Sequence, residues 1–328
     1  RLSEHPIIPD YLAYIEKRFS HVNAKRLHVV SDCGNGVAAL VAKQALEFLG
    51  CQVTGLYCDL DGRFPNHHPD PTVLENLDDL IQAVKQHKAD VGIGYDGDAD
   101  RIGAIDEEGK VMWGDRLMVV YARDILAAKP GSTIISEVKS SQSLYDDIAK
   151  RGGRPIMWKT GHSLIKTKMK CEQALLAGEM SGHMFFADRY FGYDDAIYAS
   201  CRLVEILAKS TRPLSALVAD LPNTSVTPEI RVDVSDSVKF ELVRHVQDRL
   251  AHCTKTREVL GPDKLVVRDV VTIDGVRAIF DDGWGLIRAS NTQPALVLRF
   301  EATSPERLAT IRAVIESELT AAKQALGC

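Results

Sequence analysis

Three carboxylates stand at alternate positions in Asp96–Arg101 (DGDADR), directly after the apolar run Asp90–Tyr95. Like charges so close together repel one another in a folded chain unless a cation lies among them. Carboxylate oxygens are hard ligands, and a site with few protein ligands suits a Mg²⁺ ion that also binds phosphate. We therefore expect Asp96, Asp98 and Asp100 to hold Mg²⁺, with a solvated acidic turn as the alternative.

Two other motifs place carboxylates in a similar way. An EF-hand loop would use the same aspartates first and Glu107 as its twelfth residue, but its sixth residue should be Gly and is Arg101. A haloacid-dehalogenase-like phosphatase has Asp-x-Asp at a strand end, with the first Asp as nucleophile, and it also needs a Lys and a later acidic pair. Lys139 could be that Lys, but the pair Asp281-Asp282 stands in the wrong kind of domain, so the phosphatase is the less favoured interpretation.

A second polar loop, Gly178–His183 (GEMSGH), ends the strand-like run Ala174–Gly178. Glu179, Ser181 and His183 bring a carboxylate, a hydroxyl and an imidazole together within five residues. Such groups donate to and accept from adjacent hydroxyls, as the binding of a sugar requires. The loop alone is a weak signal, because it can also be an ordinary polar turn.

A third polar loop, Arg288–Pro294 (RASNTQP), joins two strand-like runs near the C-terminus. Arg288, Ser290, Asn291 and Thr292 offer a guanidinium, two hydroxyls and a side-chain amide, beside the N–H groups of the turn. A phosphate needs several donors and prefers Arg for bidentate contact, so these residues match a phosphate-binding loop. The alternative is a polar hairpin turn.

The patterns around these loops alternate between strand and helix. In the first part, strands are expected at Leu27–Ser31, Cys51–Tyr57 and Asp90–Tyr95, and helices at Val37–Leu49 and Val73–Lys85. In the second part, strands are expected at Thr133–Val138, Pro155–Trp158 and Ala174–Gly178, and helices at Asp115–Ala127, Ser143–Lys150, Ser163–Met169 and Asp194–Ala208. Two successive βαβ-type units of about 100 residues predict two α/β domains, each with a parallel sheet covered by helices.

The pattern changes after Leu221-Pro222-Asn223. The expected elements are a strand at Pro228–Val234, a helix at Val238–Leu250, several short strands within Val270–Glu301 and a final helix at Pro305–Ala325. Such a mixture is typical of a small α+β domain. The predicted fold is two tandem βαβ-type α/β domains followed by a smaller α+β C-terminal domain, divided as residues 1–110, 111–222 and 223–328.

Composition excludes several classes of protein. The 328 residues carry 40 Lys and Arg against 45 Asp and Glu, a net charge of −5, which gives no electrostatic reason to bind nucleic acid or an anionic membrane. No apolar run is long enough to span a membrane, and the first residues lack the apolar core of a signal peptide. Seven scattered cysteines, never spaced C-x-x-C, indicate reduced thiols rather than a zinc site or disulfides. Because the chain begins with Arg, we expect that position 1 is not the start of the natural gene product.

Taken together, the loops resemble those of the α-D-phosphohexomutase superfamily, and most closely its bacterial phosphomannomutase/phosphoglucomutase branch. The resemblance covers nearly all of the chain and includes the three loops in order, with Phe64–Pro71 (FPNHHPDP) and Trp158–Lys166 (WKTGHSLIK) as further matches. Met180 and Asn291 stand where phosphoglucosamine mutases usually have Gln and Gly, which favours the hexose branch. The family fold has four domains around a substrate cleft, and this chain resembles domains two to four.

The resemblance implies a role for each matched residue. Asp96, Asp98 and Asp100 would hold Mg²⁺, while Arg101 would lie beside the phosphate that is transferred. The residues expected to contact the sugar or its other phosphate are Arg116, Glu179, Ser181, His183, Arg288, Ser290, Asn291 and Thr292. Lys139 and His162 would join Arg101 as catalytic residues, and general-base catalysis is one role open to His162.

The implied reaction moves phosphate between O1 and O6 of glucose or mannose phosphate, through a phosphoserine and a 1,6-bisphosphate intermediate, with Mg²⁺ withdrawing charge from the phosphoryl group. The sequence has no Ser-His-Asn-Pro-like nucleophile loop, which belongs to the first domain of the family. We expect a cytoplasmic, monomeric enzyme fragment that binds phosphorylated hexoses but is inactive without that phosphoserine domain. The alternative is a catalytically silent phosphosugar-binding module.

Overall fold

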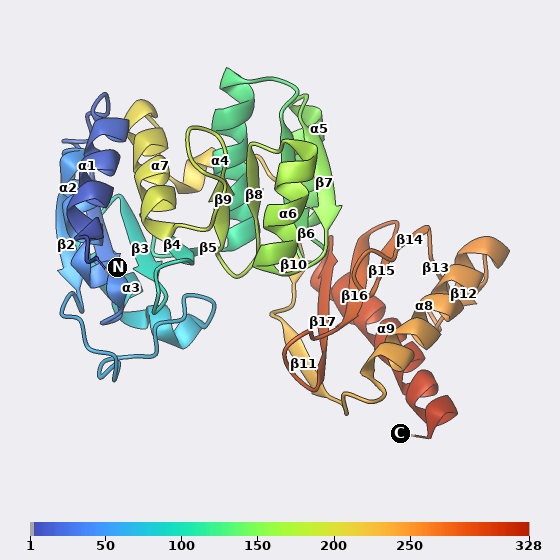
Figure 1. Cartoon of the computed structure of the whole chain (residues 1–328). Helices are drawn as coiled ribbons and strands as arrows, with labels where there is room; N and C mark the ends of the chain where they lie inside the picture. Colours follow the sequence, from blue (N-terminus) through green and yellow to red (C-terminus); the bar gives the residue numbers. More distant parts are fainter. Residues whose placement is uncertain (1–2, 328) are drawn as a thin grey trace. The chain divides into compact units, whose positions relative to one another are not determined.

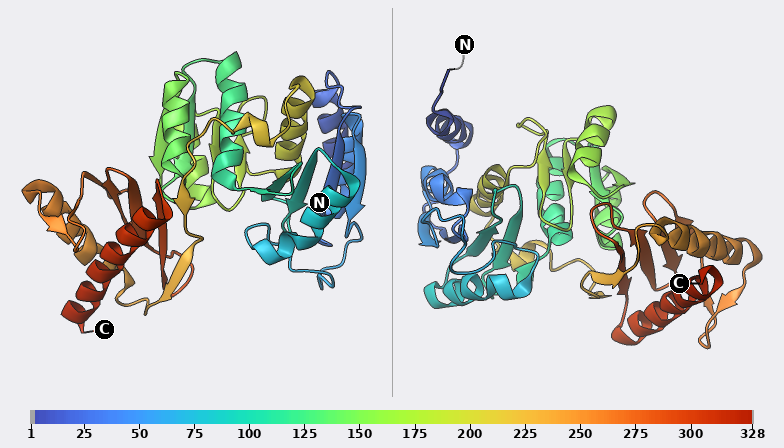
Figure 2. Two further views of the ribbon diagram at one scale, coloured as in Figure 1. Left: turned by 180° about the vertical axis from the view of Figure 1, so that it is seen from behind. Right: turned by 60° about the horizontal axis from the view of Figure 1, so that its bottom comes forward.

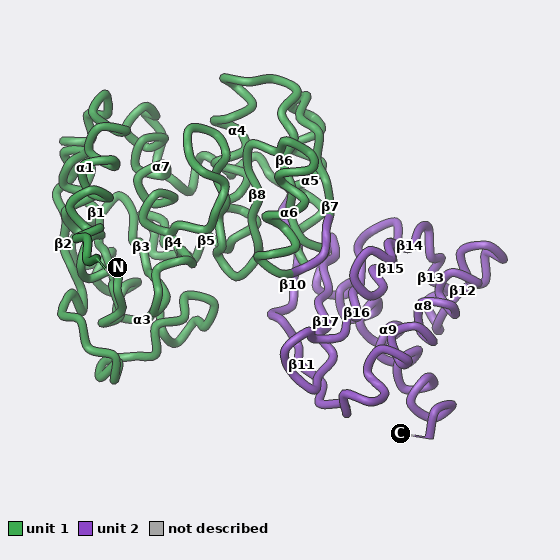
Figure 3. Tube along the Cα trace, viewed as in Figure 1, with its two compact units in different colours: residues 1–157, 161–221 green, residues 158–160, 222–328 purple. Residues whose placement is uncertain are grey.

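The computed structural model describes residues 3–327, which form two compact units (Figures 1 and 3). Unit 1 comprises Arg1–Met157 and Gly161–Leu221, and unit 2 comprises Trp158–Thr160 and Pro222–Cys328. Each unit has its own hydrophobic core. The metal and sugar loops predicted from the sequence belong to unit 1, and the predicted phosphate loop belongs to unit 2.

The first sheet of unit 1 has the strand order β2-β1-β3-β4-β5. Its strands are β1 (His28–Asp32), β2 (Gln52–Leu56), β3 (Val91–Tyr95), β4 (Ile102–Asp106) and β5 (Val111–Met112). β1 pairs in parallel with β2 and β3, as predicted, but β4 and β5 continue the sheet with antiparallel pairing. The parallel sheet expected here is therefore mixed, because the short loop after β3 can only return the chain antiparallel.

Helices cover both faces of this sheet. Side chains alternate between the faces along β1, so Val30 packs in a cluster with α3 (Asp78–His87), while Val29 belongs to the main core of unit 1. On the main-core side, α1 (Ile7–Phe19) and α2 (Ala42–Phe48) contact each other and α7 (Ala196–Lys209) (Figures 1 and 2). The helix α1 is an element that the sequence analysis does not identify.

Two expected helices of unit 1 are shorter than predicted. The run Val37–Leu49 begins as the 3₁₀ turn η1 (Val37–Leu40), and Val41 has φ −139° and ψ −28°, outside the helical region, before α2 starts. The run Val73–Lys85 likewise begins as the 3₁₀ turn η2 (Leu74–Leu77) before α3. The periodicity of apolar residues does not distinguish a 3₁₀ turn from the first turn of an α-helix.

The second sheet of unit 1 has the strand order β7-β6-β8-β9. Its strands are β6 (Thr133–Glu137), β7 (Arg154–Trp158), β8 (Leu176–Gly178) and β9 (Met184–Phe186), and its helices are α4 (Gly114–Ala128), α5 (Gln142–Lys150) and α6 (His162–Glu172). β6 and β8 are parallel, as predicted, whereas β9 returns antiparallel after a short loop. Ile134 and Leu176 of this sheet share one core with Val29 and Ile93 of the first sheet.

Unit 2 has a six-stranded antiparallel sheet with the order β10-β17-β16-β15-β14, in which β11 also pairs with β17. The strands are β10 (Ser225–Val226), β11 (Ile230–Asp233), β14 (Asp269–Val271), β15 (Val276–Phe280), β16 (Gly283–Ala289) and β17 (Ala295–Ala302), with a separate pair β12 (Val259–Leu260) and β13 (Leu265–Val266). The helices of unit 2 are α8 (Lys239–Thr256) and α9 (Pro305–Leu326). The short 3₁₀ helix η3 (Ser215–Leu217) precedes them in the chain and belongs to unit 1. The helices α8 and α9 lie against this sheet (Figure 2), and their apolar residues share one core with it. The predicted α+β character is therefore confirmed.

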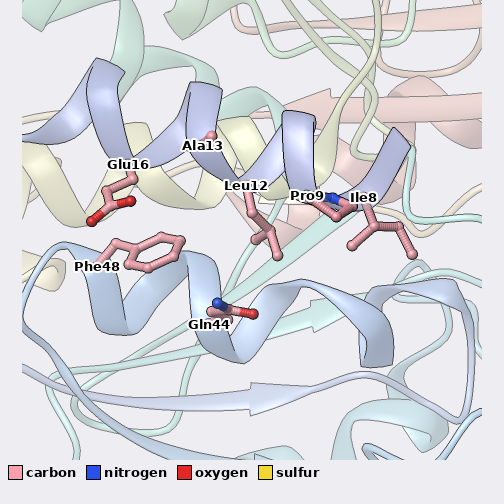
Figure 4. Close-up of a pocket in the computed structure, with 7 residues that line it drawn as sticks. All are labelled: Ile8, Pro9, Leu12, Ala13, Glu16, Gln44 and Phe48. Atoms are coloured by element: carbon pink, nitrogen blue, oxygen red, sulfur yellow. The ribbon is translucent and has the colours of Figure 1, made fainter. Parts of the chain in front are cut away.

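A shallow groove between α1 and α2 encloses about 470 Å³ (Figure 4). Its lining consists of Ile8, Pro9, Leu12, Ala13, Glu16, Gln44 and Phe48. One carboxylate and one amide among apolar side chains offer nothing that would transfer or bind a phosphate, so we do not place the functional site there.

Two further predictions concern the whole chain. In the part that the structure describes, no helix is both long and apolar enough to cross a membrane. The cysteines at positions 33, 51, 58, 171, 201 and 253 are free thiols, and Cys328 lies outside the described residues.

Candidate active site

The aspartate loop joins β3 to β4 in a tight turn, so the flanking helices of an EF-hand are not present here. The Asp96 carboxylate organises this turn, because its Oδ1 accepts the backbone N–H groups of Asp100 and Arg101, both at 3.0 Å. Asp96, Asp98 and Asp100 each offer one carboxylate oxygen, and these oxygens lie within 4.8 Å of one another. The turn thus brings the three predicted metal ligands together.

The charges in this loop are only partly balanced. Burial raises the pKa of Asp96 to about 6, although Arg101 donates from Nε to its Oδ2 at 2.6 Å. Burial acts on Asp100 in the same direction, but its hydrogen bond with His183 outweighs this and lowers the pKa of Asp100 to about 2. Carboxylate oxygens are the kind of ligand that Mg²⁺ prefers, and the ion would supply the missing positive charge.

The loop Gly178–His183 joins β8 to β9, and its three predicted side chains contact one another. His183 Nδ1 lies 2.8 Å from Glu179 Oε2 and 2.9 Å from Ser181 Oγ. Gly182 has a φ of +98°, and a Cβ atom there would lie 2.4 Å from the carbonyl oxygen of Ile102. Glycine therefore allows this loop to approach the start of β4, where the Ile102 N–H donates to the Gly182 carbonyl at 3.1 Å.

His183 connects this loop to the aspartate loop. Its Nε2 lies 3.2 Å from Asp100 Oδ1, while Nδ1 faces Glu179. Burial alone would lower the pKa of His183, but the hydrogen bonds to Asp100 and Glu179 raise it to about 9. The imidazole is therefore protonated at neutral pH and donates from both nitrogens. The hydrogen bond from His183 also outweighs burial at Glu179 and lowers the pKa of that carboxyl.

Lys139 follows β6 and lies beside the same loop. Its Nζ is 3.5 Å from Glu137 Oε1, and that oxygen also accepts the backbone N–H of Met180 at 2.9 Å. The Lys139 charge further contributes to the lowered pKa of Glu179. Lys139 is therefore held near the loop through Glu137, which the sequence analysis does not identify.

His162 and Arg116 lie at the N-terminal ends of two helices. His162 starts α6, and its ring stacks on that of His183 with a centroid distance of 6.1 Å and an interplanar angle of 28°. Arg116 stands in the first turn of α4, whose Gly114 packs so closely on the loop that a Cβ atom would lie 2.5 Å from the Glu179 carbonyl oxygen. Both predicted residues thus belong to elements that contact the loop.

The loop Arg288–Pro294 of unit 2 connects β16 to β17. Arg288 is buried, with 5% of its surface exposed, and donates from Nε to Asp274 Oδ2 at 2.9 Å. The same Asp274 oxygen accepts the backbone N–H of Thr160 at 3.0 Å. Asp274 thus fixes the orientation of the guanidinium, and none of the residues that the structure describes forms a hydrogen bond or ion pair with its two Nη groups.

Of the other predicted residues of this loop, Ser290 stabilises the turn, whereas Asn291 and Thr292 face solvent. Ser290 Oγ accepts the backbone N–H of Gln293 at 3.1 Å, so this hydroxyl holds the turn closed. Lys239 of α8 donates to the Gln293 carbonyl at 3.0 Å. Hydrogen bonds within the loop and from Lys239 thus hold the turn, while the side chains of Asn291 and Thr292 are exposed to a ligand.

Four carboxylates contact the predicted site residues, although no role was predicted for them from the sequence. They are Asp70, Glu137, Asp194 and Asp274. Asp70 accepts from Arg101 Nη1 at 3.1 Å and stands inside the quoted run FPNHHPDP, while Glu137 ends β6 at the same sheet edge as the sugar loop. Asp274 lies in an Asp-Gly turn, where an aspartate usually hydrogen-bonds the backbone. An aspartate at this position therefore does not by itself indicate a functional site.

Three family models match consecutive parts of the chain. Phosphoglucomutase/phosphomannomutase alpha/beta/alpha domain II matches residues 9–109, alpha/beta/alpha domain III matches residues 113–225, and the C-terminal domain matches residues 229–318. The chain belongs to the phosphoglucomutase/phosphomannomutase family. No model of the family's first domain is among these matches.

Individual proteins agree with this result. The phosphomannomutase/phosphoglucomutase of Pseudomonas putida is 49% identical over 296 residues, which is 90% of this chain and 61% of that protein. A crystal structure of a phosphoglucomutase/phosphomannomutase family protein from Burkholderia thailandensis is 41% identical, with a TM-score of 0.86 over 98% of this chain and 66% of that one. An Aspergillus fumigatus N-acetylphosphoglucosamine mutase, solved with GlcNAc-6P and magnesium, shares the fold at 16% identity, with a TM-score of 0.66 over 95% of this chain and 65% of that one.

This chain therefore spans about three-fifths to two-thirds of the length of these proteins.

Proposed function

We propose that this chain forms the second, third and fourth domains of a phosphohexomutase that interconverts the 1- and 6-phosphates of mannose or glucose. The observation that carries this proposal is the link made by His183, which joins Asp100 of the carboxylate triplet to Glu179 of the sugar loop. A cation-binding triplet and a hydroxyl-binding loop in one charged cluster suit the transfer of a phosphoryl group to or from a sugar hydroxyl.

In this proposal Asp96, Asp98 and Asp100 hold Mg²⁺, which would withdraw charge from the phosphoryl group in transfer. Arg101 is fixed by Asp96 and presents its guanidinium to the same phosphoryl group. Lys139 adds positive charge beside the sugar loop. His162 is mostly exposed, with Nδ1 3.7 Å from Asp194 Oδ2, and in this proposal it exchanges a proton with a substrate hydroxyl.

The sugar would be bound by Glu179, Ser181 and His183, with Arg116 beside them. Glu179 is ionised and buried, and its remaining acceptor capacity can be used by sugar hydroxyls. The second phosphate would be bound by Arg288, Ser290, Asn291 and Thr292 of the loop in unit 2. Arg288 provides the main charge of this phosphate loop, because Asp274 orients it while leaving its Nη groups available.

The phosphoserine that starts the reaction lies outside these residues in this proposal, in the domain that precedes the matched ones in relatives. Residues 1–110, 111–222 and 223–328 are the proposed domains of a cytoplasmic, monomeric enzyme. A silent phosphosugar-binding module remains the second candidate. It would bind the same ligands but would not turn them over when joined to a phosphoserine domain.

The proposed function is tested by calorimetric titration of the chain with mannose 6-phosphate and with mannose, each with and without Mg²⁺. We expect the phosphosugar to bind and the free sugar to bind far more weakly. The variant Glu179→Gln should weaken phosphosugar binding without weakening Mg²⁺ binding to the same extent. Equal affinities for the phosphorylated and the free sugar would contradict the proposal.

A further inference from the structure

One acidic residue in unit 1, Asp194, lies beside the proposed site without an assigned role. Its side chain is buried, with 8% of its surface exposed, although its neighbours in the chain are polar. One of its carboxylate oxygens lies within 4.8 Å of ligand atoms of both Asp100 and His183. Asp194 thus stands at the point where the metal loop and the sugar loop meet.

The backbone around Asp194 is fixed on both sides. Asp194 forms an isolated bridge with Phe185 of β9, and Asp195 caps α7 by accepting the N–H of Tyr198 at 2.8 Å. The N–H of Ala196 donates at 3.1 Å to the carbonyl of Ala99, which lies in the aspartate loop and has a φ of +61°. The Asp194 carboxylate therefore has a defined position relative to both loops.

The partners of Asp194 come from one face of α6. Lys166 donates from Nζ to Asp194 Oδ1 at 2.9 Å, and its ammonium also lies 5.9 Å from the centre of the Phe185 ring. His162, one turn earlier on the helix, has Nδ1 at 3.7 Å from Asp194 Oδ2. Residues four apart on a helix lie side by side, so Lys166 and His162 both face Asp194.

The ligand atoms of Asp100, His183 and Asp194 lie close enough together for a second metal site. The contacts of Asp194 instead favour the binding of an anion by Lys166. The Asp194 charge is already balanced by the Lys166 ammonium, which donates to its Oδ1 at 2.9 Å, so this carboxylate already has a cationic partner. An ammonium has three donors, and among the described residues Lys166 uses one of them, on Asp194. One-third of its side chain remains exposed.

We propose that Lys166 is a further phosphate-binding residue of this site and that Asp194 is the residue that positions it. Lysine binds phosphate as a point charge on a flexible stem, so its contribution depends on the stem being held in place. Asp194 holds the Lys166 ammonium in place, but its own negative charge also repels the phosphate and so reduces the gain in affinity. This inference rests on the proposed function, since it assumes that a phosphosugar binds next to Asp100 and His183.

The test is a double-mutant cycle with Asp194→Asn, Lys166→Met and the double variant, measured by calorimetric titration of the full chain with glucose 1,6-bisphosphate. We expect Lys166→Met to weaken binding about fivefold to tenfold and Asp194→Asn somewhat less. The double variant should bind no more weakly than Lys166→Met alone, because Asp194 acts through Lys166. Asp194→Glu, which keeps the carboxylate, should lie closer to wild type than Asp194→Asn.

Lys170→Met is the matched control, because it removes the same charge from an exposed position of α6 and should leave the affinity unchanged. Mg²⁺ affinity and the thermal midpoint, measured for every variant, should stay close to wild type. Losses that add in the double variant, an Asp194→Asn affinity equal to or above wild type, or a loss of Mg²⁺ affinity would each overturn the assignment. If wild type binds no phosphosugar, the proposed function fails, whereas if wild type binds it and Lys166→Met binds it equally well, only this inference fails.

Discussion

Replacing Gly36 with alanine should displace the aspartate loop. Gly36 ends the turn after β1, and a Cβ atom there would lie 2.7 Å from the carbonyl oxygen of Gly97, 3.0 Å from its Cα and 3.1 Å from the Asp96 carbonyl oxygen. The backbone of Gly36, with φ −81°, is open to alanine, so the effect would come from this contact and not from conformational strain. The turn and the loop are further joined by the Val37 N–H, which donates to the Gly97 carbonyl at 3.0 Å.

The expected loss of unfolding free energy is about 1–3 kcal/mol, the usual cost of inserting a methyl group into a packed contact. Because Gly97 lies between two of the proposed metal ligands, moving it should also weaken Mg²⁺ binding by about tenfold, or ~1.4 kcal/mol. Both quantities are measured on one preparation, the first by urea unfolding and the second by calorimetric titration with Mg²⁺.

Gly62→Ala is the matched control, because no heavy atom lies within 4 Å of the position of its Cβ. This variant should bind Mg²⁺ as wild type does, and it should unfold at the same or a slightly higher urea concentration. If Gly36→Ala bound Mg²⁺ with unchanged affinity while losing stability, the turn would support the fold but not the metal loop. If both quantities were unchanged, the reasoning from the contact would be wrong.

Three further predictions address single groups. Asp98→Asn should weaken Mg²⁺ binding by at least about tenfold, because the proposed site has few protein ligands, and titration calorimetry would show a metal site elsewhere if affinity were unchanged. Arg288→Ala should weaken the binding of glucose 6-phosphate by about 1.5–3 kcal/mol and leave free glucose almost unaffected, whereas equal losses for both ligands would argue against a phosphate contact. The hydrogen bond to Asp32 raises the pKa of His67, so the pair stabilises the fold below the ordinary pKa of histidine and loses this contribution as pH rises through the raised pKa. Urea unfolding should therefore show a larger difference between wild type and His67→Gln at pH 6 than at pH 9, and a difference that is equal at both pH values would contradict this linkage.

Much of the fold follows from local patterns. Short apolar runs such as Val91–Tyr95, followed by polar loops and helical periodicity, were enough to predict the parallel strands of unit 1 and the α+β character of unit 2. The strands β4 and β9 were not predicted, because each returns directly after a polar loop that the sequence reasoning treated only as a ligand site. Their antiparallel pairing depends on the shortness of those loops, which periodicity alone does not reveal.

In the candidate site, too, local sequence predicts some residues, and only the tertiary structure reveals others. Residue type and spacing identify Asp96, Asp98 and Asp100 because three carboxylates in one turn are costly without a cation. They do not identify Asp194 or Asp274, whose importance comes from partners far away in the chain: Asp194 meets Lys166, and Asp274 meets Thr160. The bridging position of His183 is likewise a tertiary result, since its contact with Asp100 joins two sheets of unit 1.

The most direct test of the central claim is a coupled mutase assay that follows the conversion of mannose 1-phosphate to mannose 6-phosphate. It compares residues 1–328 alone with the same residues joined to the first domain of the Pseudomonas putida relative, both highly purified and at equal concentration, with Mg²⁺ and a 1,6-bisphosphate present. We predict no measurable turnover by residues 1–328 alone, because in the proposed function the phosphoserine that donates phosphate lies outside them. The joined protein should turn over, and Asp98→Asn should abolish its activity. Turnover by residues 1–328 alone at the rate of the joined protein, or a joined protein indifferent to Asp98→Asn, would contradict the account.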